Sequence, residues 1–155
     1  MSNTLTKARP DESKFYYNFI KCGFNYGSTG GTEVYIPLAS GERLTDTSSS
    51  SGGTENLVMI APFDGSIETV WARSQEACDS TVIKMYYTSA NIEIPAPANY
   101  SVTVDMSVDD TSYEFDFTGA TNTFSQGNIL MFSFDPTNDA NDSHFMIVLK
   151  YDVTT

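Results

Sequence analysis

The stretch "YSVTVDMSVDDTSYEFDF", residues 100–117, contains two short segments in which apolar and polar side chains alternate. Apolar side chains occupy every second position of residues 100–106, and aromatic side chains do so in residues 112–117. Because successive side chains of a strand point to opposite faces, this period of two is typical of antiparallel strands with one buried face. The intervening "VDDTS" (108–112) is rich in turn-forming residues. The stretch therefore predicts two half-buried strands separated by a turn.

Strand patterns of this kind continue along the chain, whereas helix patterns are nearly absent. Seven further segments complete a set of nine expected strands: 15–21, 32–38, 56–61, 66–73, 81–87, 128–134 and 144–151. Sequences rich in Gly, Pro, Asn and Asp separate them, as expected for turns. The fold class predicted is all-β, an antiparallel, jelly-roll-like β-sandwich of about eight to nine strands.

A chain of 155 residues is most simply one domain. We expect an extended N-terminal arm over residues 1–14 and a single β-sandwich domain over residues 15–155. Residues 39–55, "ASGERLTDTSSSSGGTE", form an unusually long polar loop. This loop is either a solvated connection or a contact loop.

Several apolar segments are candidates for contacts between chains. "IAPFDGSIETVWARS" (60–74) predicts an apolar β-hairpin that turns at Asp64 and Gly65 and includes the tryptophan. Segments 128–134 and 144–151 are apolar on nearly both faces, which fits either the centre of the core or a subunit interface. The interface residues predicted from these segments are Trp71, Phe132, Met146 and Val148.

Charge is unevenly distributed. The net charge is −12, with a sequence pI of about 4.1, and such a surface repels phosphate, so we expect no nucleic-acid partner. Four of the eight basic residues nevertheless fall in the first 21 positions. A basic leader on an acidic body is suited to docking on another acidic surface. The segment Thr4–Pro10 is the predicted reaching segment, with Lys7 and Arg9 as its charged contacts.

The sequence shows no targeting segment. Its first 14 residues contain no apolar signal region, and no run approaches the roughly 18 apolar residues of a membrane span. The only cysteines, Cys22 and Cys78, suit a reducing site of synthesis without a disulfide framework. We therefore expect synthesis in the cytoplasm and no membrane partner.

Groups able to carry out catalysis are scarce. There is one histidine, His144, and neither cysteine lies in a nucleophile signature, so no catalytic residues and no cofactor are expected and the chain is predicted not to be an enzyme.

The strongest ligand candidate is the oxygen-rich loop "DPTNDANDS" (135–143). Its Ca²⁺ candidates are Asp135, Asn138, Asp139, Asn141 and Asp142. The same residue types are also ordinary turn formers, which is the alternative interpretation.

Two long segments resemble small β-sandwich virion structural proteins of tailed bacteriophages, particularly marine ones. They are "IAPFDGSIETVWARSQEACDSTVIKMYYTSA" (60–90) and "FTGATNTFSQGNILMFSFDPTNDANDSHFMIVLKYDVTT" (117–155). The similarity lies in a "PFDG" turn leading to a strand that ends in "RS", and in a "TF..GN" turn before two closing strands that end in "KYD". It covers residues 56–155 and leaves the N-terminal third undistinguished.

The resemblance implies a virion component without catalytic activity. The leading expectation is a capsid decoration, or cement, protein on the outer surface of a phage head, where it stabilises the shell. Its expected partners are other copies of itself, as a trimer, and the major capsid protein or other virion proteins. The alternative is an adhesin or carbohydrate-binding module on a tail or head appendage, because exposed tyrosines such as those of the pairs 16–17 and 86–87 suit a sugar as well as a protein.

Overall fold

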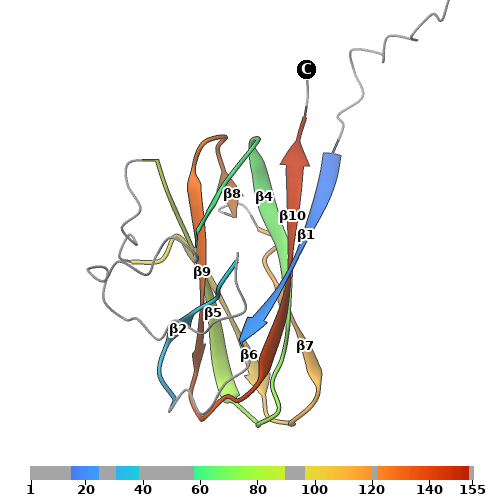
Figure 1. Cartoon of the computed structure of the whole chain (residues 1–155), viewed down its shortest axis with the longest axis vertical. Helices are drawn as coiled ribbons and strands as arrows, with labels where there is room; N and C mark the ends of the chain where they lie inside the picture. The colour runs from blue at the N-terminus through green and yellow to red at the C-terminus, as the bar shows by residue number, and fades with distance from the viewer. Residues whose placement is uncertain (1–14, 25–30, 39–57, 90–96, 120–121, 154–155) are drawn as a thin grey trace, which may run out of the picture.

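The computed structural model describes residues 15–24, 31–38, 58–89, 97–119 and 122–153. Within these ranges the chain forms ten β-strands and no helix (Figure 1). The strands are β1 (Phe15–Phe24), β2 (Val34–Tyr35), β3 (Met59–Ile60), β4 (Gly65–Arg73), β5 (Asp79–Thr88), β6 (Tyr100–Met106), β7 (Ser112–Asp116), β8 (Thr123–Phe124), β9 (Ile129–Pro136) and β10 (Ser143–Asp152). Each of the nine expected strands is present in whole or in part, and β8 is an additional two-residue strand.

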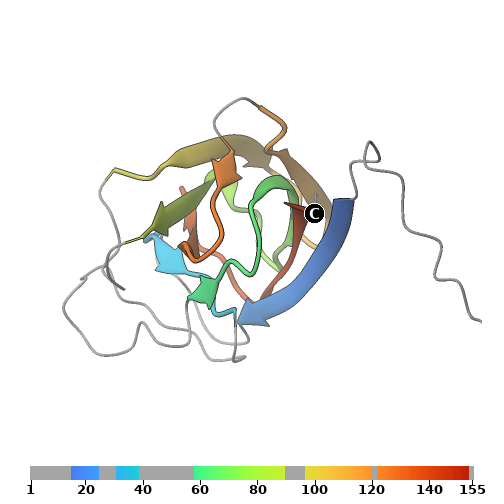
Figure 2. The ribbon, with the colours of Figure 1, turned by 90° about the horizontal axis from the view of Figure 1, so that it is seen from above.

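The strands make two antiparallel sheets that enclose a common interior, as the view from above shows (Figure 2). Sheet A has the order β1-β10-β4-β7, with β8 paired to β4. Sheet B has the order β2-β9-β5-β6, with β3 paired to β9. The predicted all-β antiparallel sandwich is therefore confirmed.

The hydrophobic core fills the space between the two sheets. Alternate residues of β10 are buried in it, for example Phe145 and Ile147, as the period-two pattern requires. The Phe134 ring lies at the centre, with its centroid 5.1 Å from that of Phe145 and 6.3 Å from that of Phe24. Strands from both sheets thus meet through aromatic contacts, which fix how the sheets stack.

The apolar segment 60–74 is not a hairpin, so that prediction is wrong. Strand β3 pairs with β9 in sheet B, whereas β4 lies in sheet A, and the connection crosses from one sheet to the other. The buried Ala61 donates a backbone hydrogen bond to Asn128 O (2.8 Å), while Asp64 O accepts one from the backbone of Asp152 (2.8 Å). Burial of the connection against both sheets has overridden the local turn signal.

The outer faces of the two sheets differ in how far they are covered. On sheet B the outward side chains of Tyr35, Tyr86 and Met131 are buried in a second small cluster, against which Val58 and Ala98 pack. On sheet A large apolar side chains remain exposed: 62% of Phe19, 39% of Met146 and 36% of Trp71. On sheet B one large apolar side chain, Ile60 of the short strand β3, is exposed, whereas on sheet A exposed apolar side chains lie on three adjacent strands.

Both cysteines are free thiols. Burial raises the pKa of the Cys22 thiol to about 12 and also raises that of Cys78. Each thiol is therefore protonated at neutral pH, whereas the thiolate is the form that reacts as a nucleophile. Among the described residues, no helix has the length and apolar character that crossing a membrane requires.

Candidate functional site

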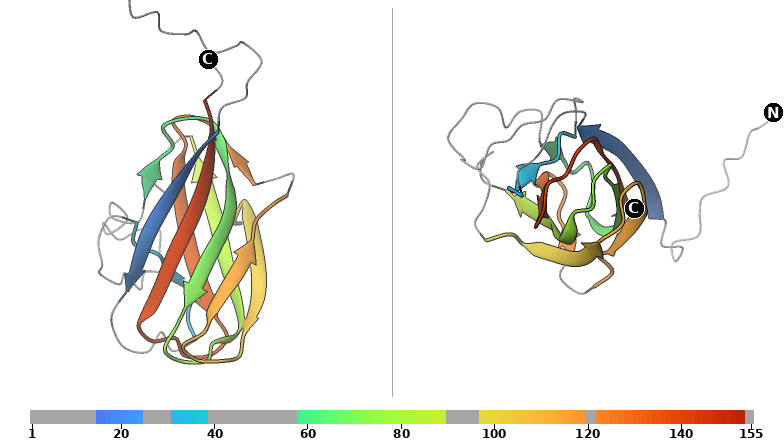
Figure 3. Two further views of the ribbon diagram at one scale, coloured as in Figure 1. Left: turned by 90° about the vertical axis from the view of Figure 1, so that its right-hand side faces the viewer. Right: turned by 90° about the horizontal axis from the view of Figure 1, so that it is seen from below.

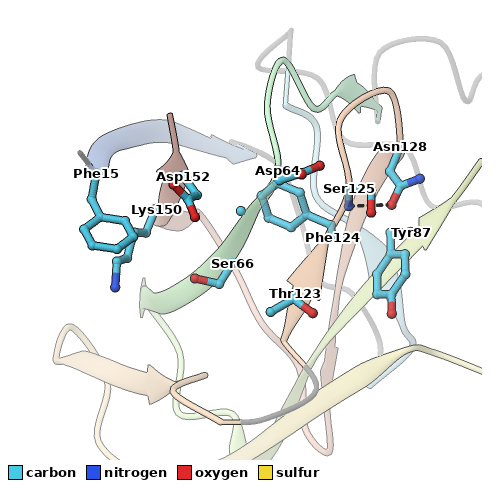
Figure 4. Close-up of a pocket in the computed structure, with 11 residues that line it drawn as sticks. Phe15, Asp64, Ser66, Tyr87, Thr123, Phe124, Ser125, Asn128, Lys150 and Asp152 are labelled. Atoms are coloured by element: carbon cyan, nitrogen blue, oxygen red, sulfur yellow. Dashed lines mark hydrogen bonds between the residues drawn. The ribbon is translucent and has the colours of Figure 1, made fainter. Parts of the chain in front are cut away.

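An open pocket of about 520 Å³ lies at one end of the sandwich, where five strands begin or end (Figure 4). Its lining is Phe15, Asp64, Gly65, Ser66, Tyr87, Thr123, Phe124, Ser125, Asn128, Lys150 and Asp152. The pocket thus combines aromatic rings with hydroxyl, amide and carboxylate groups, and its lining includes no histidine or cysteine.

Hydrogen bonds hold the polar wall of this pocket. Asp64 Oδ1 accepts a hydrogen bond from the backbone N–H of Gln126 (2.7 Å), and Asn128 Oδ1 accepts one from the N–H of Ser125 (2.9 Å), which is the dashed line in Figure 4. On the opposite side Lys150 Nζ lies 4.2 Å from the centroid of the Phe15 ring, a cation–π contact. These hydrogen bonds fix the polar wall, and the lining combines polar side chains with aromatic rings, a chemistry that suits a hydroxyl-rich ligand.

The second candidate site is the outer face of sheet A. Strand β10 is central to it, and the register places Met146 between Lys21 of β1 and Trp71 of β4. A groove of about 350 Å³ runs beside Trp71 and is also lined by Met146 and His144. The predicted interface residues Trp71 and Met146 are therefore brought together on one exposed surface.

Two other residues predicted at an interface lie elsewhere. Phe132 is fully buried in the core between the sheets, so its side chain is not at a surface and that placement is corrected. Val148 is on the outer face of sheet A but only 7% of it is exposed. Segment 128–134 is apolar on both faces because sheet B buries both, as Met131 illustrates.

Thr4, Lys7, Arg9 and Pro10 lie outside the described residues, as do residues 39–55. Their role as a reaching segment and a contact loop stays a prediction.

The outer face of sheet A carries both basic and acidic side chains. Three of the four basic side chains in the described part of the chain lie there: Lys21, Arg73 and Lys150. Arg73 donates to Asp110 Oδ1 at 2.7 Å, but both side chains are about half exposed, so the ion pair adds little stability. The acidic residues Glu114 and Asp116 occupy β7 at the other edge.

The oxygen-rich loop between β9 and β10 uses its predicted Ca²⁺ candidates in local contacts. Asp135 pairs with Lys84 (2.8 Å), Asn138 donates to the Asp79 carboxylate, and Asn141 O accepts a hydrogen bond from Ser74 Oγ (2.9 Å). Asp142 adopts a positive φ of 39°, a conformation that Asp tolerates in turns. Among the described residues no three or more His, Cys, Asp or Glu are grouped so as to hold a metal. Calcium binding here stays a prediction.

A partly buried ionic network lies on the outer face of sheet B. Glu33 accepts hydrogen bonds from Tyr86 Oη (2.9 Å) and Ser133 Oγ (2.5 Å) and pairs with Lys84 Nζ at 3.1 Å. Burial alone would raise the pKa of Glu33, but these three donors outweigh it and hold the pKa below its ordinary value. Burial alone would lower the pKa of Lys84, but Asp135 and Glu33 raise it above its ordinary value.

We expect Glu33→Gln to lower the free energy of unfolding by about 1–3 kcal/mol at pH 7, because a charged acceptor of three hydrogen bonds is lost. The Glu33 contribution is present above its unfolded pKa of about 4.3 and is lost as the pH falls through the lower folded value. The Lys84 contribution is present below about pH 10.4 and is lost only as the pH rises through its raised pKa. Urea unfolding between pH 7 and pH 3 should therefore show a shallower acid loss in Glu33→Gln.

The matched control for this experiment is Glu76→Gln, since the Glu76 side chain is exposed. It should keep the acid dependence of the unmodified chain, and equal slopes for Glu33→Gln and the unmodified chain would contradict the network's role.

Sequence reasoning did not identify the end pocket, because its residues come from strand ends that are far apart in the chain. Phe15 and Lys150 are brought together only by the pairing of β1 with β10. The one local signal was the Asp64-Gly65 turn, which was interpreted as a hairpin.

Comparison with known proteins finds a weakly similar solved structure. No protein-family model matches the chain, and no curated protein matches it. The solved cryo-electron-microscopy structure of Broad Bean Stain Virus is similar at 14% sequence identity, over 97% of this chain and 91% of that chain, with a TM-score of 0.29. Similarity at that level supports no inference about the function of this chain.

Proposed function

We propose that the chain is a structural protein of a virus particle and that its sandwich is a jelly roll. When the two-residue strands β3 and β8 are left aside, the eight remaining strands have the orders β1-β10-β4-β7 and β2-β9-β5-β6. This is the interleaved order in which two Greek keys fold over each other. Jelly rolls occur in viral capsid proteins and also in lectins, so strand order by itself does not select the role.

The observation that carries the proposal is the exposed apolar face of sheet A. Three large side chains, Phe19, Trp71 and Met146, remain accessible there, although the same chain buries Tyr35, Tyr86 and Met131 on the outer face of sheet B. Exposed apolar clusters on a folded protein mark contact surfaces. Trp and Met are among the residues enriched at protein interfaces. A particle subunit needs such a surface, whereas an independent monomer does not.

The finer assignment is a capsid decoration protein on the outer surface of the head of a tailed bacteriophage. The net charge of −12 favours an external position, because packaged nucleic acid would repel the chain. Its partners would be the major capsid protein and further copies of itself. The proposed attachment element is the basic leader of residues 1–14.

Deletion of residues 1–14 tests this role. The truncated chain should bind undecorated particles at least about tenfold more weakly, equivalent to about 1.4 kcal/mol, because Lys7 and Arg9 would no longer reach the acidic shell. Co-sedimentation with particles measures the affinity, and thermal unfolding establishes that the truncated chain is folded. Equal binding by the two forms would contradict attachment through the leader.

The end pocket favours a second candidate function, a carbohydrate-binding module on an appendage. Hydroxyl groups of Ser66, Thr123 and Ser125 line it together with the rings of Phe15 and Tyr87. Under this alternative, calorimetric titration with host surface polysaccharide should give saturable heat that Ser66→Ala and Thr123→Ala weaken. The structural role predicts no heat in that titration.

A further inference from the structure

We propose that the outer face of sheet A pairs with the same face of a second copy of this chain, about a two-fold axis parallel to the strands. The inference deepens the proposed structural role by naming a partner for that face, and it does not depend on attachment to a particle. Figure 3 (left) views the face directly, with β1, β10, β4 and β7 side by side and no described segment crossing them.

The central row of this face is self-complementary. Cα pairing aligns Lys21 of β1 with Met146 of β10, Met146 with Trp71 of β4, and Trp71 with Glu114 of β7. Directly paired residues project on the same side of a sheet. The row therefore reads, from one edge of the sheet to the other, as a positive charge, two apolar side chains and a negative charge.

A two-fold axis between β10 and β4 exploits this order. Such an axis reverses the sequence of strands, so β1 of one copy faces β7 of the other. Lys21 of each copy then lies opposite Glu114 of its partner, and Met146 lies opposite Trp71. The same patch serves both chains, which is the property of an isologous interface. One rotation satisfies all four members of the row.

The neighbouring rows do not repeat this charge order. One contains Gly23, His144, Arg73 and Ser112, and the other contains Phe19, Val148, Thr69 and Asp116, so the central row alone sets the orientation. In the central row, facing copies with β1 over β1 would bring Lys21 over Lys21 and Glu114 over Glu114, whereas the two-fold arrangement brings each Lys21 opposite a Glu114. In a chain with a net charge of −12, this local pattern opposes general repulsion and selects one orientation.

The shape of the face also fits a second copy. The groove of about 350 Å³ beside Trp71 is the space opposite the partner's Met146 in this arrangement. A flexible thioether is suited to filling an irregular groove and to contact with an indole ring. The exposed Phe19 extends the apolar area toward the edge strand β1.

Sedimentation velocity of the purified full-length chain, without particles, tests the inference. The unmodified chain should associate to two copies at micromolar concentration, and Trp71→Glu should raise the dissociation constant at least about 30-fold. The control Ile60→Glu places the same charge on an exposed apolar position of β3 in sheet B and should leave the dissociation constant unchanged. Thermal unfolding checks that each variant is folded.

A charge exchange tests the register. Lys21→Glu and Glu114→Lys should each weaken association, and the double variant should recover most of it, because the pair is re-formed with its signs reversed. A chain that stays monomeric at all concentrations, a trimer as the limiting species, or a double variant as weak as the two losses combined would each overturn the inference. A chain that dimerises but does not bind particles would uphold the inference while contradicting the proposed function.

Discussion

Replacing Phe134 by alanine should lower the free energy of unfolding by about 3–5 kcal/mol, the range for removing a buried aromatic ring. The ring is fully buried and makes an edge-on contact with Phe145 at 5.1 Å between centroids. It also approaches Phe24 at 6.3 Å. Because β9 supplies Phe134 while β10 and β1 supply its partners, the substitution removes the contact that joins sheet B to sheet A. Chemical denaturation gives the free energy directly.

The control for Phe134→Ala is Ile60→Ala, which shortens an apolar side chain that is 68% exposed. This variant should change the free energy of unfolding by no more than about 0.5 kcal/mol, as is usual for surface substitutions. A loss for Phe134→Ala below about 1.5 kcal/mol would mean that the aromatic contacts do not hold the sheets together.

Substituting valine for Gly65 is expected to cause the second large loss, at least about 2–3 kcal/mol. A Cβ at this position would lie 2.5 Å from the backbone oxygen of Lys150 and 2.9 Å from the Phe124 ring. The oxygen belongs to the paired strand β10 and the ring belongs to β8, so relief of the clash requires parting of β4 from a neighbour. Glycine is present here because two strands and an aromatic ring converge on one backbone position.

Gly119→Ala is the matched control for Gly65→Val. Its Cβ would approach the hydroxyl of Tyr100 at 2.9 Å, and that hydroxyl is the movable end of a side chain. It should cost much less stability, and thermal unfolding of both variants makes the comparison. Similar melting temperatures for the two variants would contradict the close approach at Gly65. Gly65→Val should also narrow the end pocket, of which Gly65 forms part.

Local patterns in the sequence predicted the strands well because alternation is a property of each strand alone. β10 illustrates this, since Phe145 and Ile147 are buried as inward residues while the alternate residues His144 and Met146 are exposed. The same alternation accounts for Trp71, whose neighbours Val70 and Ala72 are buried in the core while its own ring projects outward.

The pairing of strands is harder to predict from the sequence, since it depends on contacts between distant parts of the chain. The turn at Asp64 and Gly65 has the composition of a hairpin, yet β3 and β4 belong to different sheets. Phe132 could not be assigned to core or interface from its pattern, because β9 is apolar on both faces. In the structure this chain buries both faces of β9, and Phe132 lies in the core.

For the candidate sites as well, local segments predict individual residues, whereas strand pairing determines which residues are neighbours. The apolar segments predict Trp71 and Met146 as contact residues, which stays a prediction, but only the register of β4 with β10 shows that they are neighbours. The charged ends of that row, Lys21 and Glu114, are 93 positions apart by residue number and carry no sequence signal of their own. Long-range pairing creates the surface on which the account rests.

The central claim is the proposed place of this chain in a virus particle, and quantitative mass spectrometry of purified, salt-washed particles tests it most directly. A structural protein of the particle should be recovered in many copies, at a fixed ratio to the major capsid protein from one preparation to the next. Absence of the chain from washed particles, while it is abundant in the infected cell, would contradict the account.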